Sequence, residues 1–547
     1  MFGKQKFNSY EEFVNKFKVT VPDNFNFAFD VMDRLAQEKG DDLAMIYVDN
    51  EHQRKEYNYR FFAAKSAQLA NGLAQLGIKK GDKVMIILYR RVEFWIVMLA
   101  LHKLGAIGVP SPALLTGKDI VFRVNFAKIK AVIVDESIVD RVEEIKDECP
   151  SLQYLIVAGE NKKTGWKGLA EVMAKQSDNF KPEQKPGGKD SLTIFFSSGT
   201  TGMPKMVEHN HTYPLGHLLT GMYWHNLEPG DVHFTLADTG WAKAVWGKFY
   251  GQWMAGGVVF VYDFRGKFDP VDLLQVLSEH KVNSFCAPPT VYRFLIGQNL
   301  GHYDLSSLKH CTTAGELLND SVFEAWQSAL GLPIYEGYGQ TETTLQIGTF
   351  PFMQPKPGSI GKPAPGWDIV LLDEQGQEVA QGEEGEICVR LNEKRPLGLF
   401  CGYLQDPEKT AQVFQGGVYH TGDKAWQDED GYFWFLGRVD DLIKSSGYRI
   451  GPFEVESALI THPAVVEAAV TGVPDPVRGQ AVKATVVLAA GYQPSEELTK
   501  ELQAHVKKVT APYKYPRIVE YVKELPKTIS GKIKRAEIRQ KDLSKLK

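Results

Sequence analysis

Residues 190–205 read DSLTIFFSSGTTGMPK, an apolar run followed at once by a loop of small, hydroxylated and cationic residues. The apolar run predicts a buried strand, and the loop has two serines, two threonines, two glycines and a lysine within nine residues. Glycines let backbone N–H groups approach an anion, hydroxyl groups donate hydrogen bonds, and lysine adds positive charge. We therefore expect this loop to bind phosphate, although it lacks the Walker spacing and a flexible surface loop is the alternative.

The residues before this loop alternate between helical and strand patterns. Apolar residues recur at helical spacing in residues 59–76 and 92–104, and short apolar runs at residues 83–88, 131–134 and 154–157 indicate buried strands. This alternation is typical of a parallel sheet covered by helices. The sequence thus predicts an α/β fold with a large N-terminal domain of doubly wound subdomains.

The pattern changes in the last third of the chain. Residues 358–437 contain short apolar runs separated by close turns, which predict a β-rich subdomain. A charged turn at residues 438–441 then precedes a segment of ordinary domain size. We place the boundary at Asp440, with an N-terminal domain of residues 1–439 and a small α+β C-terminal domain of residues 440–547.

Charge and composition exclude some classes of partner. The 547 residues include 63 Lys and Arg against 67 Asp and Glu, a net charge of −4, which gives no indication of a nucleic-acid partner. Residues 501–547 alone have 13 basic and 5 acidic side chains. This basic tail is a candidate phosphate-facing surface.

The cysteines and the apolar stretches indicate the compartment. The five cysteines are widely spaced without a C-x-x-C pair, which argues against a disulfide framework and a thiolate zinc site. The first ten residues lack the apolar core of a signal peptide, and Glu11 and Glu12 are unlike an acid-poor transit peptide. The most apolar stretches fall short of the ~18 residues of a membrane span. The sequence therefore predicts a cytoplasmic protein with no membrane span.

A second candidate loop is Tyr338-Gly339-Gln340-Thr341-Glu342, which follows a short predicted strand. An aromatic ring can stack on a base, a threonine hydroxyl can contact a phosphate, and a carboxylate can bind Mg²⁺. Together these groups suit a nucleoside triphosphate. An ordinary turn with Thr341 as a helix cap is the alternative.

Further motifs occur at Gly315-Glu316, Thr421-Gly422-Asp423 and residues 437–441, 446–451 and 526–532. With these motifs in order and at the family's spacing, the chain resembles the adenylate-forming (ANL) superfamily, and within it the medium-chain acyl-CoA synthetases. The resemblance runs from about Asp41 to Arg539. It departs from the family at Gly315-Glu316-Leu317, where Gly-Glu-Pro is more usual.

The resemblance implies a nucleotide site. The glycine-rich loop would hold the β- and γ-phosphates, Tyr338 would stack on adenine, and Glu342 would bind Mg²⁺. Asp423 and Arg438 would bind the ribose hydroxyls. The residues expected to contact ATP or AMP are Ser197, Ser198, Gly199, Thr200, Thr201, Gly202, Lys205, Gly315, Glu316, Tyr338, Gly339, Gln340, Thr341, Asp423 and Arg438.

The resemblance also implies a two-step reaction in which a carboxylic acid reacts with ATP to give an acyl-adenylate and pyrophosphate, and coenzyme A then takes the acyl group. Lys532, with Thr341 and Glu342, would be catalytic, and Asp440 would be the hinge of a mobile C-terminal domain. A carrier protein as acceptor and a non-catalytic nucleotide-binding homologue are the alternatives. A homodimer is possible.

Coenzyme A and the acyl group would occupy further positions. The expected coenzyme A contacts are Ser446, Gly447, Arg449, Arg478, Lys507 and Tyr515, and the expected acyl pocket has Trp241, Gly339 and Ala287. Relatives that use acetate have Trp at the position of Gly339, so Gly339 predicts open volume and an acid longer than propionate. Trp241 as plain core and Lys507 on a solvated basic face are the alternatives.

Two groups of residues have no assigned role. His209, His211, His217, His225 and His233 lie close together in sequence, but their spacing does not favour a zinc site. Lys243 and Lys248 lie in an otherwise aromatic stretch, and the sequence does not decide between a salt bridge and a contact with a polar substrate group.

Overall fold

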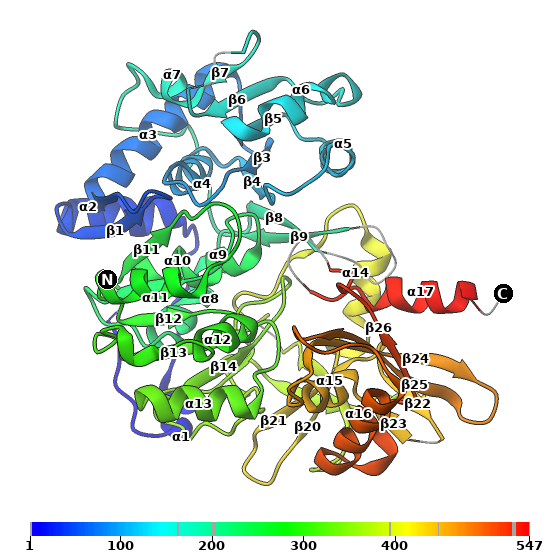
Figure 1. Cartoon of the computed structure of the whole chain (residues 1–547). Coiled ribbons are helices and arrows are strands. Elements are labelled where there is room, and N and C mark those ends of the chain that lie inside the picture. The colour runs from blue at the N-terminus through cyan, green and yellow to red at the C-terminus, as the bar shows by residue number, and fades with distance from the viewer. Residues whose placement is uncertain are drawn as a thin grey trace.

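The computed structural model describes residues 3–160, 163–197, 204–392, 395–446, 448–527 and 532–545. Four sheets with their helices make up the molecule, and Figure 1 shows the sheet of β3–β7 at one end and the C-terminal sheet, in orange and red, to one side. The predicted α/β fold class is confirmed.

The first sheet has eight strands and contains the hairpin that flanks the glycine-rich loop. Neighbouring strands are parallel from β8 through β4, β3, β5 and β6 to β7, whereas β8 and β9 are antiparallel. In spatial order the strands are β19 (Gly402–Tyr403), β9 (Lys205–Asn210), β8 (Ser191–Ser197), β4 (Ile107–Pro110), β3 (Lys83–Ile87), β5 (Ala131–Asp135), β6 (Tyr154–Ala158) and β7 (Lys167–Gly168).

The second sheet has nine strands, and its centre is also parallel. Parallel strands place their carboxyl ends at one edge, where ligands of open α/β sheets bind. In spatial order they are β16 (Lys362–Pro363), β15 (Ile347–Gly348), β14 (Ile334–Tyr338), β13 (His310–Ala314), β12 (Ser284–Cys286), β10 (Val232–Thr235), β11 (Val258–Tyr262), β1 (Leu43–Val48) and β2 (Arg54–Asn58).

Two smaller sheets follow. The antiparallel sheet β17 (Ile369–Leu372), β18 (Gly385–Arg390), β20 (Val418–Gln427) and β21 (Phe433–Arg438) is the predicted β-rich region. The last sheet begins at β22 (Ile443–Ser445), shortly after Asp440, and the predicted boundary at that residue stays a prediction. Its other strands are β23 (Tyr448–Ile450), β24 (Val465–Asp475), β25 (Gly479–Leu488) and β26 (Ile518–Tyr521).

Helices cover these sheets and enclose separate apolar cores. The largest core joins α3 and α4 to both parallel sheets, and another lies between the last sheet, α15 and α16. The helices are α1 (Tyr10–Lys16), α2 (Arg34–Lys39), α3 (Tyr59–Leu76), α4 (Glu93–Leu104), α5 (Gly117–Ala127), α6 (Val139–Glu143), α7 (Leu169–Met173), α8 (Tyr213–Leu219), α9 (Ala242–Gly247), α10 (Tyr250–Met254), α11 (Pro270–Glu279), α12 (Pro289–Ile296), α13 (Asp320–Leu330), α14 (Pro407–Val413), α15 (Pro452–Ile460), α16 (Glu496–Val509) and α17 (Arg535–Lys545).

Two short helices follow Trp241 with a break between them. The first, α9, ends at Gly247, and α10 begins at Tyr250. The Gln252 side chain accepts a hydrogen bond from the Phe249 N–H at 3.0 Å, and the Trp95 indole donates to the Lys248 carbonyl at 2.7 Å. These side chains satisfy the backbone groups that the break leaves unpaired.

Candidate nucleotide and acyl site

The glycine-rich loop connects two paired strands. Ser197 at the end of β8 is the register partner of Lys205 at the start of β9, so the loop is the turn of this hairpin. Of the predicted phosphate contacts, Ser198, Gly199, Thr200, Thr201 and Gly202 lie outside the described residues.

Lys205 and Glu342 occupy the same part of the site. The ammonium of Lys205 lies 5.0 Å from the ring centre of Tyr403, and the Tyr403 hydroxyl donates to Glu342 Oε1 at 2.9 Å. Burial lowers the pKa of Lys205, and the charge of Glu342 opposes this effect. The structure therefore places the Lys205 ammonium and the Glu342 carboxylate close together, beside the β8–β9 hairpin that carries the glycine-rich loop.

Asp423 is the centre of a polar cluster. Its Oδ2 accepts hydrogen bonds from the Tyr338 hydroxyl and Gln340 Nε2, both at 2.6 Å, and its Oδ1 lies 3.3 Å from an Arg438 guanidinium nitrogen. Asp423 on β20 and Arg438 on β21 are register partners, and Tyr338 is the last residue of β14. Two sheets thus bring together residues that are far apart in sequence.

The charges of this cluster are strongly perturbed. Burial raises the pKa of Asp423, whereas the charges of Arg438 and Lys532 act in the opposite direction. Burial and the nearby Asp423 raise the pKa of Tyr338 well above its usual range, so its hydroxyl is a hydrogen-bond donor at neutral pH.

The loop at Gly315 requires a glycine for its backbone conformation. Gly315 has a φ of +98°, and a β-carbon there would meet nothing within 4 Å, so conformation and not space selects glycine. Glu316 accepts a hydrogen bond from the Thr290 hydroxyl at 2.9 Å, and Lys243 Nζ donates to the Ala314 carbonyl at 2.9 Å. Leu317 packs against the small core that contains Tyr338.

The predicted open volume over Gly339 is absent from the structure, and this expectation was wrong. A β-carbon at Gly339 would lie 2.3 Å from Cη2 of Trp246 and 2.6 Å from the Thr344 carbonyl oxygen. The indole of Trp246, on α9, fills the space that glycine leaves. The residue that limits this volume therefore belongs to another element.

The other predicted acyl-pocket residues lie around α9 and β12. Trp241 is the N-terminal cap residue of α9 and is half-buried, so it is not plain core. Ala287 follows β12 and is fully buried, and its carbonyl accepts a hydrogen bond from the Thr313 hydroxyl at 2.8 Å.

The predicted coenzyme A residues lie in two groups of the C-terminal segment, one beside β22 and β25 and the other at and after the end of α16. The Ser446 N–H donates to the Arg478 carbonyl at 3.0 Å, and Lys507 Nζ lies 3.9 Å from the ring centre of Tyr515. The rings of Tyr448 and Tyr513 stack with centres 4.1 Å apart, which joins the two groups into one surface. Gly447 and the Arg449 side chain lie outside the described residues.

The predicted hinge residue pairs with β21, and the next residue pairs with the last helix. Asp440 lies 3.6 Å from Nε of Arg438, and Asp441 pairs with Arg539. Lys532 is exposed, and its charge acts on Asp423 and on Lys243. The C-terminal segment thus faces the nucleotide cluster in this conformation.

Several residues that contact the predicted site residues had no such role assigned from the sequence. His209 Nε2 donates to the carbonyl of Thr341 at 2.8 Å, and the Tyr419 hydroxyl donates to Gln340 Oε1 at 2.7 Å. Tyr403 and Trp246 were missed for the same reason: their roles depend on contacts between distant elements. Only Tyr419, close before Thr421-Gly422-Asp423, was adjacent to a recognised motif.

Lys248 and the five histidines of residues 209–233 are buried, whereas Lys243 is half-buried. Lys248 is fully buried and donates to the Ala237 carbonyl at 2.7 Å, and burial lowers its pKa to about 7. His225 and His233 lie 3.0 Å from the hydroxyls of Thr312 and Ser284, respectively.

Comparison with known proteins identifies the family. The family of AMP-binding enzymes matches residues 32–404, and the AMP-binding enzyme C-terminal domain matches residues 454–532. The mitochondrial acyl-coenzyme A synthetase ACSM3 of Mus musculus is 42% identical over 98% of this chain and 94% of that protein. Human mitochondrial ACSM4 is 43% identical over 97% of this chain and 93% of that protein.

Solved structures with a similar fold are also CoA ligases. The anthranilate CoA ligase AuaEII in complex with anthranoyl-AMP has a TM-score of 0.88 at 31% identity, covering 96% of this chain and 99% of that one. A benzoate CoA ligase from Burkholderia xenovorans LB400 has a TM-score of 0.82 at 27% identity, covering 94% of this chain and 100% of that one.

The predicted cytoplasmic location is contradicted by these relatives. The ACSM3, ACSM4 and ACSM5 synthetases that match over nearly the whole chain are mitochondrial proteins. The argument from unpaired cysteines failed because a reducing interior is not unique to the cytoplasm.

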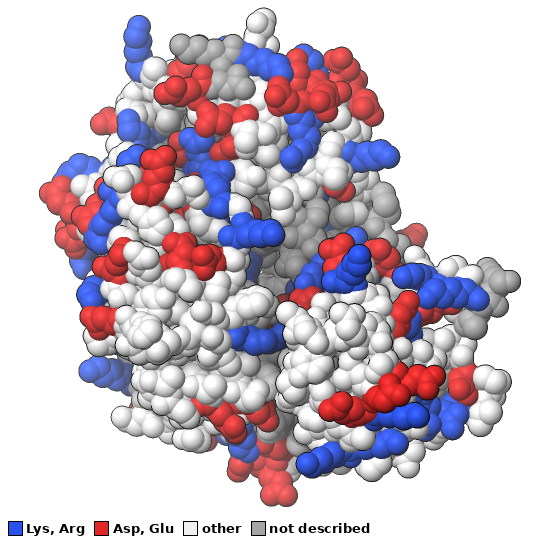
Figure 2. Space-filling view, viewed as in Figure 1, with Lys and Arg blue, Asp and Glu red and all other residues white. Residues whose placement is uncertain are grey.

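Among the described residues, no helix combines the length and apolarity that crossing a bilayer requires. Acidic and basic side chains are interspersed over the face in Figure 2, in keeping with the balanced composition.

Proposed function

Because this chain belongs to the AMP-binding enzyme family, we propose that it is an AMP-forming acyl-CoA synthetase. It activates a carboxylic acid with ATP and transfers the acyl group from the adenylate to coenzyme A. The relatives' names support this reaction, and they also support a mitochondrial location.

The Asp423 cluster is the observation that carries the proposal. A buried carboxylate with an arginine on one oxygen and neutral donors on the other is held in one orientation. A ribose hydroxyl can donate to this carboxylate, and the ring of Tyr338 offers a face to adenine. The same residues thus bind both parts of a nucleoside.

Lys205 and Glu342 would receive the triphosphate. Lys205 supplies positive charge to the β- and γ-phosphates together with the glycine-rich loop. Glu342 fits a Mg²⁺ site because a carboxylate oxygen is a hard ligand and Tyr403 fixes its partner oxygen. When bound, Mg²⁺ would neutralise phosphate charge.

Lys532 would act in the first step. A carboxylate oxygen attacks the α-phosphorus and pyrophosphate leaves, so two anions must approach each other. An ammonium group between the carboxylate and the α-phosphate stabilises this arrangement, with Thr341 beside the phosphate. The nearness of Lys532 to the Asp423 cluster supports this role.

The second step would use the surface of Ser446, Arg478, Lys507 and Tyr515. Coenzyme A carries phosphates and an adenine, which suit basic side chains and exposed aromatic rings. Gly447 and Arg449 belong to the same proposed surface. We place the hinge at Asp440, between domains of residues 1–439 and 440–547. A homodimer remains a prediction.

We propose a medium-chain, branched or aromatic acid as the substrate. Trp246 lies against Gly339 and would line the acyl pocket there, with Trp241 and Ala287 on neighbouring segments. Similar solved structures are ligases of anthranilate and benzoate, which supports a flat or compact acyl group.

Acid-dependent exchange of labelled pyrophosphate into ATP tests the proposal. We expect exchange with one or more acids of a panel from acetate to decanoate that includes benzoate, and AMP and acyl-CoA when coenzyme A is added. Asp423→Asn should raise the KM for ATP at least ~10-fold, the scale for disturbing a buried charge pair. Asp373→Asn, in an exposed turn, is the matched control.

Three outcomes would contradict the proposal. Absence of exchange with every acid would indicate a non-catalytic nucleotide-binding protein. Exchange without acyl-CoA formation would indicate another acceptor, such as a carrier protein. Equal KM values for ATP in Asp423→Asn and the parent would show that Asp423 does not contribute to ATP binding.

A further inference from the structure

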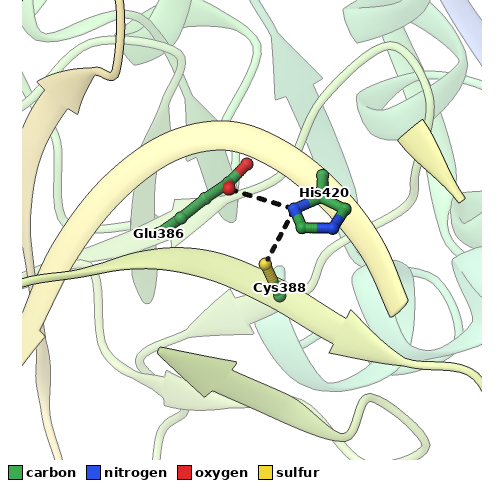
Figure 3. Close-up of side chains that lie close together, drawn as sticks. All are labelled: Glu386, Cys388 and His420. Carbon is green, nitrogen blue, oxygen red and sulfur yellow. Dashed lines mark hydrogen bonds and ion pairs between the residues drawn. The ribbon is translucent and has the colours of Figure 1, made fainter. Parts of the chain in front are cut away.

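Three side chains of different ligand types lie together on the antiparallel sheet. Glu386 and Cys388 are alternate residues of β18 and so share one face of the sheet. Cys388 is the register partner of His420 on β20. Figure 3 shows one imidazole nitrogen of His420 facing both the carboxylate and the thiol.

Their spacing suits one metal ion. His420 Nδ1 lies 3.0 Å from Glu386 Oε2 and 3.5 Å from Cys388 Sγ, and the three ligand atoms lie within 4.8 Å of one another. Tetrahedral zinc binds sulfur at about 2.3 Å and nitrogen or oxygen at about 2.1 Å, which separates ligand atoms by about 3.3–3.6 Å. Small side-chain adjustments would reach this geometry.

The surroundings hold the ligands in place. The other carboxylate oxygen, Glu386 Oε1, accepts a hydrogen bond from the Gly422 N–H at 2.8 Å, which orients Oε2 toward His420. Cys388 is buried among Val370, Leu372 and Val418. The Glu386 and His420 side chains are 22% and 23% exposed, so an ion has an entry path and water can take a fourth position.

This cluster lies on the opposite face of the sheet from the nucleotide residues. Tyr419 and His420 are consecutive strand residues, so their side chains point to opposite faces. Tyr419 bonds to Gln340, which also binds Asp423. The cluster is therefore distinct from Glu342, the proposed Mg²⁺ ligand.

We propose that Glu386, Cys388 and His420 form a binding site for a divalent transition-metal ion of the zinc type. A thiolate and an imidazole favour zinc or cobalt over magnesium and calcium, which prefer oxygen ligands. Burial, with the neighbouring Glu386, raises the pKa of the Cys388 thiol, so the ion must displace its proton. The alternative is a hydrogen-bonded acid, imidazole and thiol cluster that takes no metal.

Titration of the metal-free full-length protein with Co²⁺ tests the site. We expect one equivalent to produce the visible bands of four-coordinate cobalt with a near-ultraviolet thiolate band, and Zn²⁺ to abolish both. Cys388→Ser should abolish the thiolate band, and His420→Gln should weaken Co²⁺ binding at least 10-fold. Cys401→Ser is the matched control, since Cys401 is a partly buried cysteine outside the cluster, and it should retain the full spectrum.

The variants distinguish the loss of a metal ligand from the loss of the folded structure. Because Cys388 is buried, the folding of Cys388→Ser is checked first by thermal melts. If this variant is unfolded, His420→Gln, at a partly exposed position, decides. A parent protein without a thiolate band would overturn the proposal. A folded Cys388→Ser that keeps the band, or an undiminished affinity in His420→Gln, would also overturn it.

Discussion

The indole of Trp246 lies directly against the backbone of Gly339, so that a β-carbon at position 339 would come within 2.3 Å of Cη2. The two residues belong to different elements yet share one volume. A side chain at either position excludes one at the other. The pair, and not Gly339 alone, therefore limits the proposed acyl pocket.

Trp246→Ala is expected to shift the acid preference toward longer chains. Removal of the indole opens space beside Gly339, and each additional buried methylene contributes about 0.8 kcal/mol, or about fourfold in kcat/KM. The measurement is kcat/KM over a series of linear acids. An unchanged chain-length profile would show that Trp246 does not face the acyl group.

Gly339→Ala should destabilise the protein by about 1–3 kcal/mol, the usual range for overpacking. In the Trp246→Ala background the same change should have a smaller effect, since the clashing ring is gone and only the Thr344 carbonyl oxygen, 2.6 Å from the new β-carbon, still opposes it. Urea unfolding of the four proteins of this double-mutant cycle measures the coupling. Additive effects would mean that the two residues do not compete for space.

Contiguous patterns in the sequence were sufficient to predict a nucleotide site, whereas contacts between distant elements could not be predicted from it. The hydroxylated loop after β8 and the Tyr338 loop each carry their chemistry within a few adjacent residues, so both could be recognised. The role of Trp246 arises only when α9 packs beside the end of β14. The break after Gly247 also depends on such a contact, because the Trp95 indole that stabilises it lies on α4, far away in the sequence.

Lys532→Ala should reduce adenylate formation at least ~10³-fold, the scale for losing one preorganised charge contact. Thioester formation from supplied acyl-adenylate should be nearly unchanged, because the carboxylate is already activated. Pyrophosphate exchange and single-turnover thioester formation measure the two steps separately. Equal losses in both would argue against a role confined to the first step.

Lys507→Ala should raise the KM for coenzyme A without changing pyrophosphate exchange. Lys507 lies over the Tyr515 ring on the proposed coenzyme A surface. Lys508→Ala is the control, since Lys508 is also exposed at the end of α16. The same KM in both variants would favour a solvated basic face.

Lys248 should make stability depend on pH. Burial lowers its pKa from 10.5 to about 7, so between these values the unfolded chain binds more protons than the folded protein. Stability should therefore rise with pH across this window, by at most about 1.4 kcal/mol per unit. Relative to the parent, Lys248→Met should lack this gain in urea unfolding between pH 7 and 9. Parallel pH dependences would show that Lys248 is charged in the fold.

The formation of an acyl-adenylate is tested most directly by following a carboxylate oxygen. The acid, labelled with ¹⁸O in its carboxylate, is converted with ATP and coenzyme A, and the products are analysed by mass spectrometry. Attack of the carboxylate on the α-phosphorus predicts one ¹⁸O atom in AMP and none in pyrophosphate. Label in inorganic phosphate with ADP as the product, or AMP without label, would contradict the account.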